Sequence, residues 1–381
     1  MIEVADIFRE HGSRYRSKVK MPVHVHKAMA SIENCRTSNL GGHVEKCDEC
    51  GVIRISYNSC RNRHCPKCQH HAKELWLEDR LKDLLPIQYY HVVFTFPEEL
   101  NELCLYNKEK LYSILFKASA ETLKELSKDN KYIGAEIGFT SILHTWGQNL
   151  TYHPHIHSVV TGGGLSEDGS RWIHGKKDFF IPVRVLSKVF RGKFLYFLRR
   201  EFYKNKLVLK KSTQEFYTLL EEIKQKEWVV YCKKPFKSAG RVMAYLGRYT
   251  HRIAISNHRI KKLENGNVTF EYKDYRDKNR KKYMTISAVE FIRRFLLHIL
   301  PHRFMKIRHY GLMSNRNRNA KLKKAKKILG VKLNEGVMSK SKAERIEKYQ
   351  KCPYCRRGAM VRKYELKARS SPLPIISKMV L

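Results

Sequence analysis

The middle of the chain carries short apolar runs of the kind that form β-strands. HVVFTF (91–96) is rich in β-branched and aromatic residues and ends at Pro97, which is typical of a strand. FTSILHTW (139–146) and HIHSVVTGG (155–163) predict two more strands on either side of a short polar turn. The same pattern recurs later in the chain, at EWVVYC (227–232), RIAISN (252–257) and a hairpin over 267–286 whose tip is at 274–278.

Helical periodicity separates these runs, so the fold class that we predict is α+β. An amphipathic helix is expected where Leu111, Leu115, Ala118 and Leu123 recur near helical spacing. Further helices are predicted at 189–202, 238–251 and 288–300, the last of which stops before Pro301.

The composition narrows the class of protein. The chain has 381 residues, with 76 Lys+Arg against 36 Asp+Glu and a net charge of +40. Its 42% hydrophobic content excludes a disordered polybasic chain. A folded protein with this charge is expected to bind a polyanion, with nucleic acid the first choice and an anionic membrane surface the second. No apolar run is long enough to span a membrane, and the charged N-terminus does not fit a secretion signal, so we expect a cytoplasmic, DNA-associated protein.

Three domains are expected from the distribution of cysteine, apolar and basic residues. A cysteine-rich, zinc-ribbon-like, DNA-binding domain should occupy residues 1–86, a catalytic domain 87–300, and a basic C-terminal arm with a CxxC knuckle 301–381. The arm concentrates positive charge without an acidic residue between, in Arg316, Arg318, Lys321, Lys323, Lys324, Lys326 and Lys327.

Two CxxC knuckles in the N-terminal part predict a structural zinc site. Cys47 and Cys50 form the first and Cys65 and Cys68 the second, and four thiolates in two tight turns suit a closed tetrahedral Zn²⁺ site. Neighbouring residues could build a second site or replace a ligand of the first, namely Cys35, His43, Cys60 and His64. The C-terminal knuckle of Cys352 and Cys355 supplies half a site, and the sequence does not show what completes it. Arginines among these ligands, Arg61 and Arg63 included, should contact DNA phosphates.

The motif HPHIH predicts half of a divalent metal site. Residues two apart in a strand point to the same face, so His155 and His157 present neighbouring imidazoles. A hairpin turn centred between Thr151 and Tyr152 would place His144 on that same face, which makes His144 the preferred third ligand. Gln148 is the reserve ligand. His153 is interpreted as a structural histidine.

Tyr245 and Tyr249 are a candidate pair of nucleophiles. On a helix, residues four apart project from one face, although such a pair usually serves core packing. A phenol with an ordinary pKa of about 10 is a weak nucleophile at neutral pH. Nearby cations would stabilise the phenolate and hold a phosphate, and Arg241, Arg248 and Arg252 crowd this helix.

Several stretches of the chain resemble one family. It is similar to the zinc-binding rolling-circle insertion-sequence transposases, members of the His-hydrophobic-His (HUH) single-strand endonucleases, over nearly its whole length. The matching stretches are GGHVEKCDECG, SYNSCRNRHCPKCQ, HVVFTFP, LHTWGQNLTYHPHIHSVVTGGG, YLGRYTHRIAISNHRI and FIRRFLLHILPHRFMKIRHYG. The resemblance implies a central ferredoxin-like antiparallel sheet, a metal-binding pair in His155 and His157, and nucleophilic Tyr245 and Tyr249.

The expected chemistry is transesterification of single-stranded DNA. With Mg²⁺ or Mn²⁺ at the histidines, a tyrosine would attack the scissile phosphate and leave a 5′-phosphotyrosine and a free 3′-OH. The expected partners are single-stranded DNA, the terminal hairpins of the element, target DNA and a host helicase, since no P-loop is found in the sequence.

Three alternatives compete with this interpretation. A non-catalytic zinc-ribbon DNA-binding protein explains the charge and the cysteines and leaves the histidines and tyrosines as coincidence. A metallohydrolase of the metallo-β-lactamase type would need Asp-His after the histidine pair, where Ser158 and Val159 stand. A replication initiator or conjugative relaxase would share the chemistry and often carries a helicase.

Overall fold

The computed structural model divides the chain into two compact units. One unit comprises residues 1–72, 251–299 and 336–381, and the other comprises 73–250 and 300–335. The structure describes residues 1–176, 180–233, 236, 242, 245, 247, 253–275, 277–331 and 351–368. Segments that follow residue 250 pair with both the N-terminal and the central parts of the chain, because β12 joins β1 and β11 joins β4.

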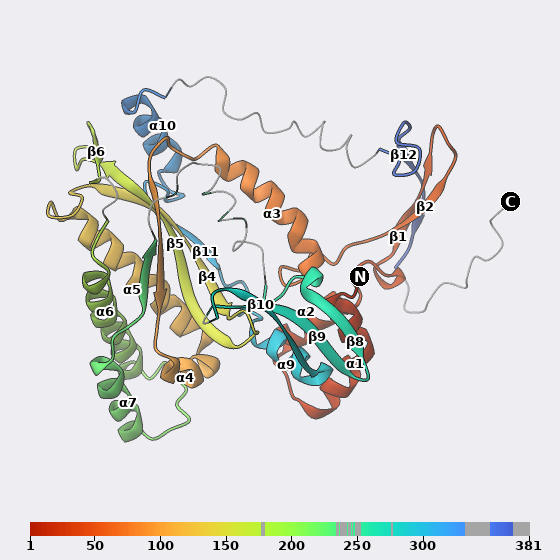
Figure 1. Cartoon of the computed structure of the whole chain (residues 1–381), viewed down its shortest axis with the longest axis horizontal. Coiled ribbons are helices and arrows are strands. Elements are labelled where there is room, and N and C mark those ends of the chain that lie inside the picture. The colour runs from red at the N-terminus through yellow and green to blue at the C-terminus, as the bar shows by residue number, and fades with distance from the viewer. Residues whose placement is uncertain are drawn as a thin grey trace. The chain divides into compact units, whose positions relative to one another are not determined.

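An antiparallel sheet forms the second unit, in the order β11-β4-β5-β3-β7 with β6 paired to β5. Its long central strands, β4 and β5, form a hairpin, and its edge strand β11 comes from beyond residue 300 (Figure 1). The strands are β3 (Tyr89–Thr95), β4 (Glu136–Trp146), β5 (Tyr152–Leu165), β6 (Trp172–His174), β7 (Val230–Lys233) and β11 (Ile307–Gly311).

Helices cover one face of this sheet, and strand periodicity decides which side chains meet them. Figure 1 shows α5 and α6 along that face. Phe94 of β3, Leu143 of β4 and Ile156 of β5 pack in the large apolar core, while alternate residues face the other way. The helices are α4 (Asn101–Tyr106), α5 (Lys108–Lys128), α6 (Val183–Tyr203), α7 (Thr213–Gln225) and α10 (Arg318–Ile328), with a 3₁₀ turn η2 (Glu98–Leu100).

The first unit contains two small sheets and several helices. One sheet has the order β12-β1-β2 and the other β10-β9-β8, and both are antiparallel. Helix α9 carries a strong apolar face, and Phe295 meets Phe8 of α1 edge-to-face with ring centroids 5.3 Å apart. The helices are α1 (Val4–Lys18), α2 (Val23–Glu33), α3 (Pro66–Leu81, which continues into the second unit) and α9 (Ala288–Leu297). The strands are β1 (Gly42–Cys47), β2 (Ile53–Tyr57), β8 (Ile260–Glu264), β9 (Asn267–Asp274), β10 (Arg280–Ser287) and β12 (Met360–Leu366), with 3₁₀ turns η1 (Ser38–Leu40) and η3 (Asn257–Arg259).

One expectation for the later part of the chain needs correction. Residues 253–257 of the predicted strand RIAISN are not a strand, because Ala254 takes a positive φ of 51° and the chain turns at η3. At the start of the basic arm, β11 joins the central sheet, and α10 packs through Leu322 and Ala325 on an apolar cluster. Within the described residues, no helix is long and apolar enough to cross a membrane.

Candidate active site and metal centres

Three histidines meet on the face of the central sheet opposite α5 and α6. His144 on β4 pairs directly with His155 on β5, and His157 follows two residues along the same strand. Ring nitrogens of the three imidazoles lie within 4.8 Å of one another, and Nε2 of His155 is 2.9 Å from Nε2 of His157. The structure thus brings together the expected pair and its preferred third partner.

The turn between β4 and β5 explains why this juxtaposition could be foreseen from the sequence. The pairing of His144 with His155 centres the hairpin between Asn149 and Leu150, two residues earlier than expected. Moving the centre by two whole residues leaves every side chain on its original face, so His144 still faces the histidine pair. Gln148, the reserve ligand, lies in the turn beyond the end of β4.

A fourth histidine, His91 on β3, joins this group and was not foreseen. Its Nε2 is 2.9 Å from Nδ1 of His157, and it also forms a hydrogen bond with the Tyr245 hydroxyl. The Tyr245 oxygen is 3.1 Å from the same Nδ1 of His157. The sequence alternation already places His91 on the face of β3 that points away from the core residues Val92 and Phe94. Its position beside His157, however, depends on the pairing of β3 with β5.

Burial favours the neutral form of His91, His155 and His157. It is the main reason that the pKa of His91 and the pKa of His155 fall to about 3, and it lowers the pKa of His157 well below its usual range. Nδ1 of His155 donates to the carbonyl of His153 over 2.6 Å, which leaves Nε2 for a ligand. His153 thus supports its neighbour through its backbone.

This donor set fits a divalent metal ion. Neutral imidazoles are the protonation state that binds a dication, and imidazole suits first-row transition metals better than it suits Mg²⁺. His144, His155 and His157 are the residues that would hold such an ion.

The helix that carries the tyrosines is described only in part. Val242, Tyr245 and Gly247 have helical backbone, and Tyr245 packs beside Val242 and Ile142 under the histidine face. Tyr249, Arg241, Arg248 and Arg252 lie outside the described residues.

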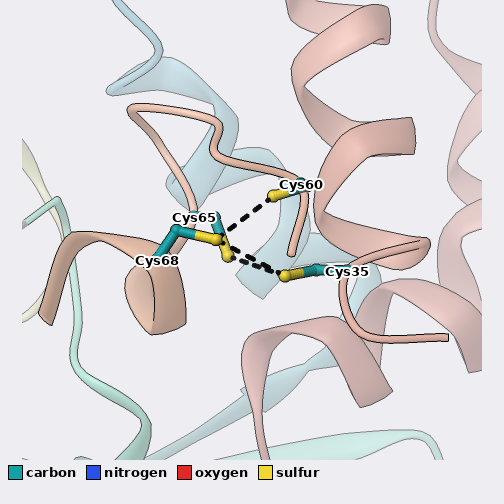
Figure 2. Close-up of side chains that lie close together, drawn as sticks. All are labelled: Cys35, Cys60, Cys65 and Cys68. Atoms are coloured by element: carbon teal, nitrogen blue, oxygen red, sulfur yellow. Dashed lines mark hydrogen bonds between the residues drawn. The ribbon is translucent and has the colours of Figure 1, made fainter. Parts of the chain in front are cut away.

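Four cysteines form a compact cluster in the first unit. Figure 2 shows Cys35 from the loop after α2, Cys60 from the loop after β2, and Cys65 and Cys68 at the start of α3. Cys68 Sγ is 3.6 Å from both Cys35 Sγ and Cys60 Sγ, and Cys65 Sγ is 3.7 Å from Cys35 Sγ. A tetrahedron with Zn–S distances of about 2.3 Å has edges of about 3.8 Å, so the spacing fits zinc.

The acidity of these thiols shows why a cation suits the cluster. A hydrogen bond with Cys60 is the largest effect on Cys35, lowering the pKa of Cys35 to about 2, and it raises the pKa of Cys60 to about 12. One thiolate therefore suppresses the ionisation of its neighbours. A bound cation would offset the repulsion between neighbouring thiolates.

The cysteine grouping corrects the expected zinc site. Cys47 and Cys50 do not join Cys65 and Cys68; they lie with Cys352 and Cys355, whose sulfurs share a second group. Cys35 and Cys60, which join Cys65 and Cys68, are among the neighbouring residues that were expected to replace a ligand of the first site. The sequence could not show the other pairing, because Cys352 and Cys355 lie far along the chain from Cys47 and Cys50. Among the described residues, neither expected histidine joins a cysteine group: His43 contacts Glu45 and His64 contacts Asn62.

The candidate DNA-binding cations fall into different environments. Arg61 is exposed, whereas Arg63 is half-buried, and burial lowers its pKa. On α10, Lys321 binds Glu136 at 2.6 Å and Arg318 lies 3.8 Å from Asp83. The exposed cations of this region are Arg316, Lys323, Lys324 and Lys327.

Comparison with known proteins identifies the class to which the chain belongs. Residues 7–96 match the family described as transposase zinc-binding domain, and residues 138–321 match the family described as putative transposase. A putative transposase, y4qJ, of Sinorhizobium fredii (strain NBRC 101917 / NGR234) is 47% identical over 374 residues, which cover 94% of each chain. The chain therefore belongs to the zinc-binding transposases of insertion sequences.

A second relative indicates the type of element. The transposase for insertion sequence element IS801 of Pseudomonas savastanoi pv. phaseolicola is 29% identical over 298 residues, covering 74% of this chain and 68% of that protein. The protein is thus an IS91/IS801-like transposase, a DNA-cleaving enzyme, consistent with rolling-circle transposition. Among solved structures, the conjugative relaxase TrwC in complex with oriT DNA aligns with 42% of this chain and 71% of its own at 13% identity and a TM-score of 0.24, a likeness too weak to bear on the fold.

Proposed function

We propose that this transposase cuts single-stranded DNA at the ends of its element by nucleophilic attack of Tyr245. The observation that carries the proposal is the position of the Tyr245 hydroxyl, 3.1 Å from a ring nitrogen of His157, which belongs to the three-histidine group. A nucleophile must lie beside the groups that bind the scissile phosphate, and the three-histidine group is the part of the described sheet that suits that role.

In the proposed reaction, the phenol oxygen of Tyr245 attacks phosphorus and the bond from phosphorus to the 3′ oxygen breaks. The products are a 5′-phosphotyrosine and a free 3′-OH, so the phenolic proton is balanced by the proton that the leaving oxygen gains. Mn²⁺ or Mg²⁺ bound by His144, His155 and His157 would supply charge stabilisation at the phosphate. Attack of a 3′-OH on the phosphotyrosine reverses the step and joins the strand to target DNA.

His91 serves in this proposal as a positioning residue. Its Nε2 is hydrogen-bonded to the Tyr245 hydroxyl, which holds the phenol oxygen at the histidine face. The same nitrogen lies beside Nδ1 of His157, so one buried imidazole contacts both the nucleophile and a metal ligand. Tyr249, four residues after Tyr245 in the sequence, would provide the second nucleophile for the second strand transfer.

We further propose that the central sheet is a ferredoxin-like HUH nuclease fold, with catalysis in residues 87–300. Antiparallel β4, β5 and β3 with α5 and α6 on one face support this assignment. Zinc-dependent DNA binding is assigned to residues 1–86, and terminal hairpins, single-stranded ends and target DNA are the expected ligands. Unwinding is assigned to a host helicase.

The test is covalent trapping. Purified protein, Mn²⁺ and a single-stranded oligonucleotide containing an element end should give an adduct that survives denaturing electrophoresis. Tyr245→Phe/Tyr249→Phe should abolish it, whereas Tyr231→Phe should retain it, because Tyr231 is an exposed tyrosine of the same sheet. An adduct that persists in the double variant would show that another residue is the nucleophile.

A further inference from the structure

A strand from near the C-terminus completes a sheet that begins near the N-terminus. β12 (Met360–Leu366) pairs antiparallel with β1 (Gly42–Cys47), from Gly42 opposite Leu366 to Cys47 opposite Met360. β1 also pairs with β2 (Ile53–Tyr57), so it is the central strand of three (Figure 1). The C-terminal segment is therefore structurally part of the N-terminal hairpin.

The two remaining CxxC knuckles meet at one end of this sheet. Cys47 Sγ is 3.7 Å from Cys355 Sγ, and Cys50 Sγ is 3.8 Å from Cys352 Sγ. All four sulfurs lie within 4.8 Å of one another, and all four cysteines are free thiols. The two distances match the edge of about 3.8 Å that a tetrahedral site with Zn–S bonds of about 2.3 Å requires.

Backbone hydrogen bonds shape both knuckles in the same way. The N–H of Cys50 donates to Cys47 Sγ at 3.5 Å, and the N–H of Gly358 donates to Cys355 Sγ at 3.4 Å. Such bonds stabilise thiolates, the form that binds metal. A Cβ on Gly358 would lie 2.7 Å from Cys47 Sγ, so glycine permits the close approach of the two segments.

Direct contacts between the two knuckles are few but specific. The Asp48 N–H donates to the Ala359 carbonyl at 3.1 Å, and the Ala359 N–H donates to the Asp48 carboxylate at 2.7 Å. The buried apolar group at this end consists of Cys47, Cys352 and Met360. So small a group stabilises a sheet only weakly, and small domains of this kind usually depend on a bound metal.

We propose that Cys47, Cys50, Cys352 and Cys355 bind a second Zn²⁺, which fastens the C-terminal segment to the N-terminal hairpin. The matched zinc-binding family ends at residue 96, so it contains half of these ligands. Each knuckle has two thiolates, and neither completes a site without the other. The inference goes beyond the proposed function and does not depend on the tyrosine chemistry.

The first measurement is zinc content of the full-length protein. The wild type should contain two Zn²⁺ per chain, and Cys352→Ser/Cys355→Ser should contain one. Cys232→Ser is the matched control, because Cys232 lies on β7 of the second unit and belongs to neither cysteine group, and it should keep two. One Zn²⁺ in the wild type, or disulfides linking Cys47 to Cys355 and Cys50 to Cys352, would overturn the proposal.

The second measurement tests whether the proposed zinc site holds the C-terminal segment to the N-terminal hairpin. A protease recognition site is introduced into residues 332–350 of the full chain, and the protein is cut after purification. The C-terminal fragment should stay bound to the remainder in zinc buffer and be released from the Cys352→Ser/Cys355→Ser variant, which still holds zinc at the other cluster. Retention of the fragment by that variant would refute the fastening role, and the separate Mn²⁺-dependent adduct assay reports independently on the proposed function.

Discussion

Replacing His91 with phenylalanine tests the histidine group most directly. The change keeps an aromatic ring of similar size in a buried position on β3 and removes the nitrogen that lies 2.9 Å from Nδ1 of His157. It also removes the hydrogen-bond partner of the Tyr245 hydroxyl on β3. His144, His155 and His157 are unchanged, so the proposed ligands all remain.

The size of the effect follows from the contact that is lost. A hydrogen-bonded partner of a metal-binding histidine orients the ring, and its loss typically weakens metal binding 10- to 100-fold. We therefore expect the Kd for Mn²⁺ to rise by about that factor, or about 1.4–2.7 kcal/mol. At saturating Mn²⁺ the rate of adduct formation should still be reduced, because Tyr245 has lost its hydrogen bond with His91.

Calorimetric titration of the zinc-loaded protein with Mn²⁺ measures the first effect, and single-turnover adduct formation measures the second. His309→Phe is the matched control: His309 lies on β11 of the same sheet and bonds to Thr140 at 2.9 Å, away from the three histidines. A Kd for His91→Phe equal to that of His309→Phe would refute the assigned role of His91.

Two further predictions concern charge. Lys323→Ala/Lys324→Ala should flatten the slope of log affinity for single-stranded DNA against log salt by about 1.4, since each phosphate contact contributes about 0.7; Lys321→Ala should change it less, because Lys321 binds Glu136. Salt titrations by fluorescence anisotropy measure these slopes. If the loss of Lys321 flattened the slope as much as the loss of each exposed lysine, the assignment of Lys323 and Lys324 as phosphate contacts would be contradicted. Burial lowers the pKa of Lys108 from 10.5 to about 8. Between pH 8 and pH 10.5 the unfolded state therefore holds more protons than the folded state. The free energy of unfolding should rise with pH over this range, by up to about 3 kcal/mol. Urea unfolding at pH 8 and pH 10 should show this rise in the wild type and lose it in Lys108→Met; an identical rise in both would place its origin elsewhere.

Local patterns in the sequence were sufficient for the centre of the fold. The apolar runs that predicted β3, β4 and β5 are strands. His144 lies on the same face of the sheet as His155 and His157 because side chains alternate between the two faces along each strand. An error of two residues in the position of the turn did not change it. A periodic signal of this kind survives small errors in the boundaries of elements.

Contacts between distant segments could not be obtained in this way. His91 meets His157 because β3 lies next to β5, and Cys47 meets Cys355 because β12 lies next to β1. Neither adjacency has a signal within one segment. RIAISN failed for the opposite reason: its residues have strand propensity, yet the positive φ of Ala254 and the turn at Asn257–Arg259 place them in a buried loop.

The pairing of β1 with β12 also sets an order for synthesis. Cys47 and its partner Met360 are separated by 360 − 47 = 313 positions in the sequence. At roughly 5–20 residues per second, the N-terminal hairpin waits about 15–60 s on the ribosome before its third strand emerges. During that interval one edge of β1 has no strand to pair with. A chain that terminates before residue 351 would keep all four histidines of the central sheet and never close this edge.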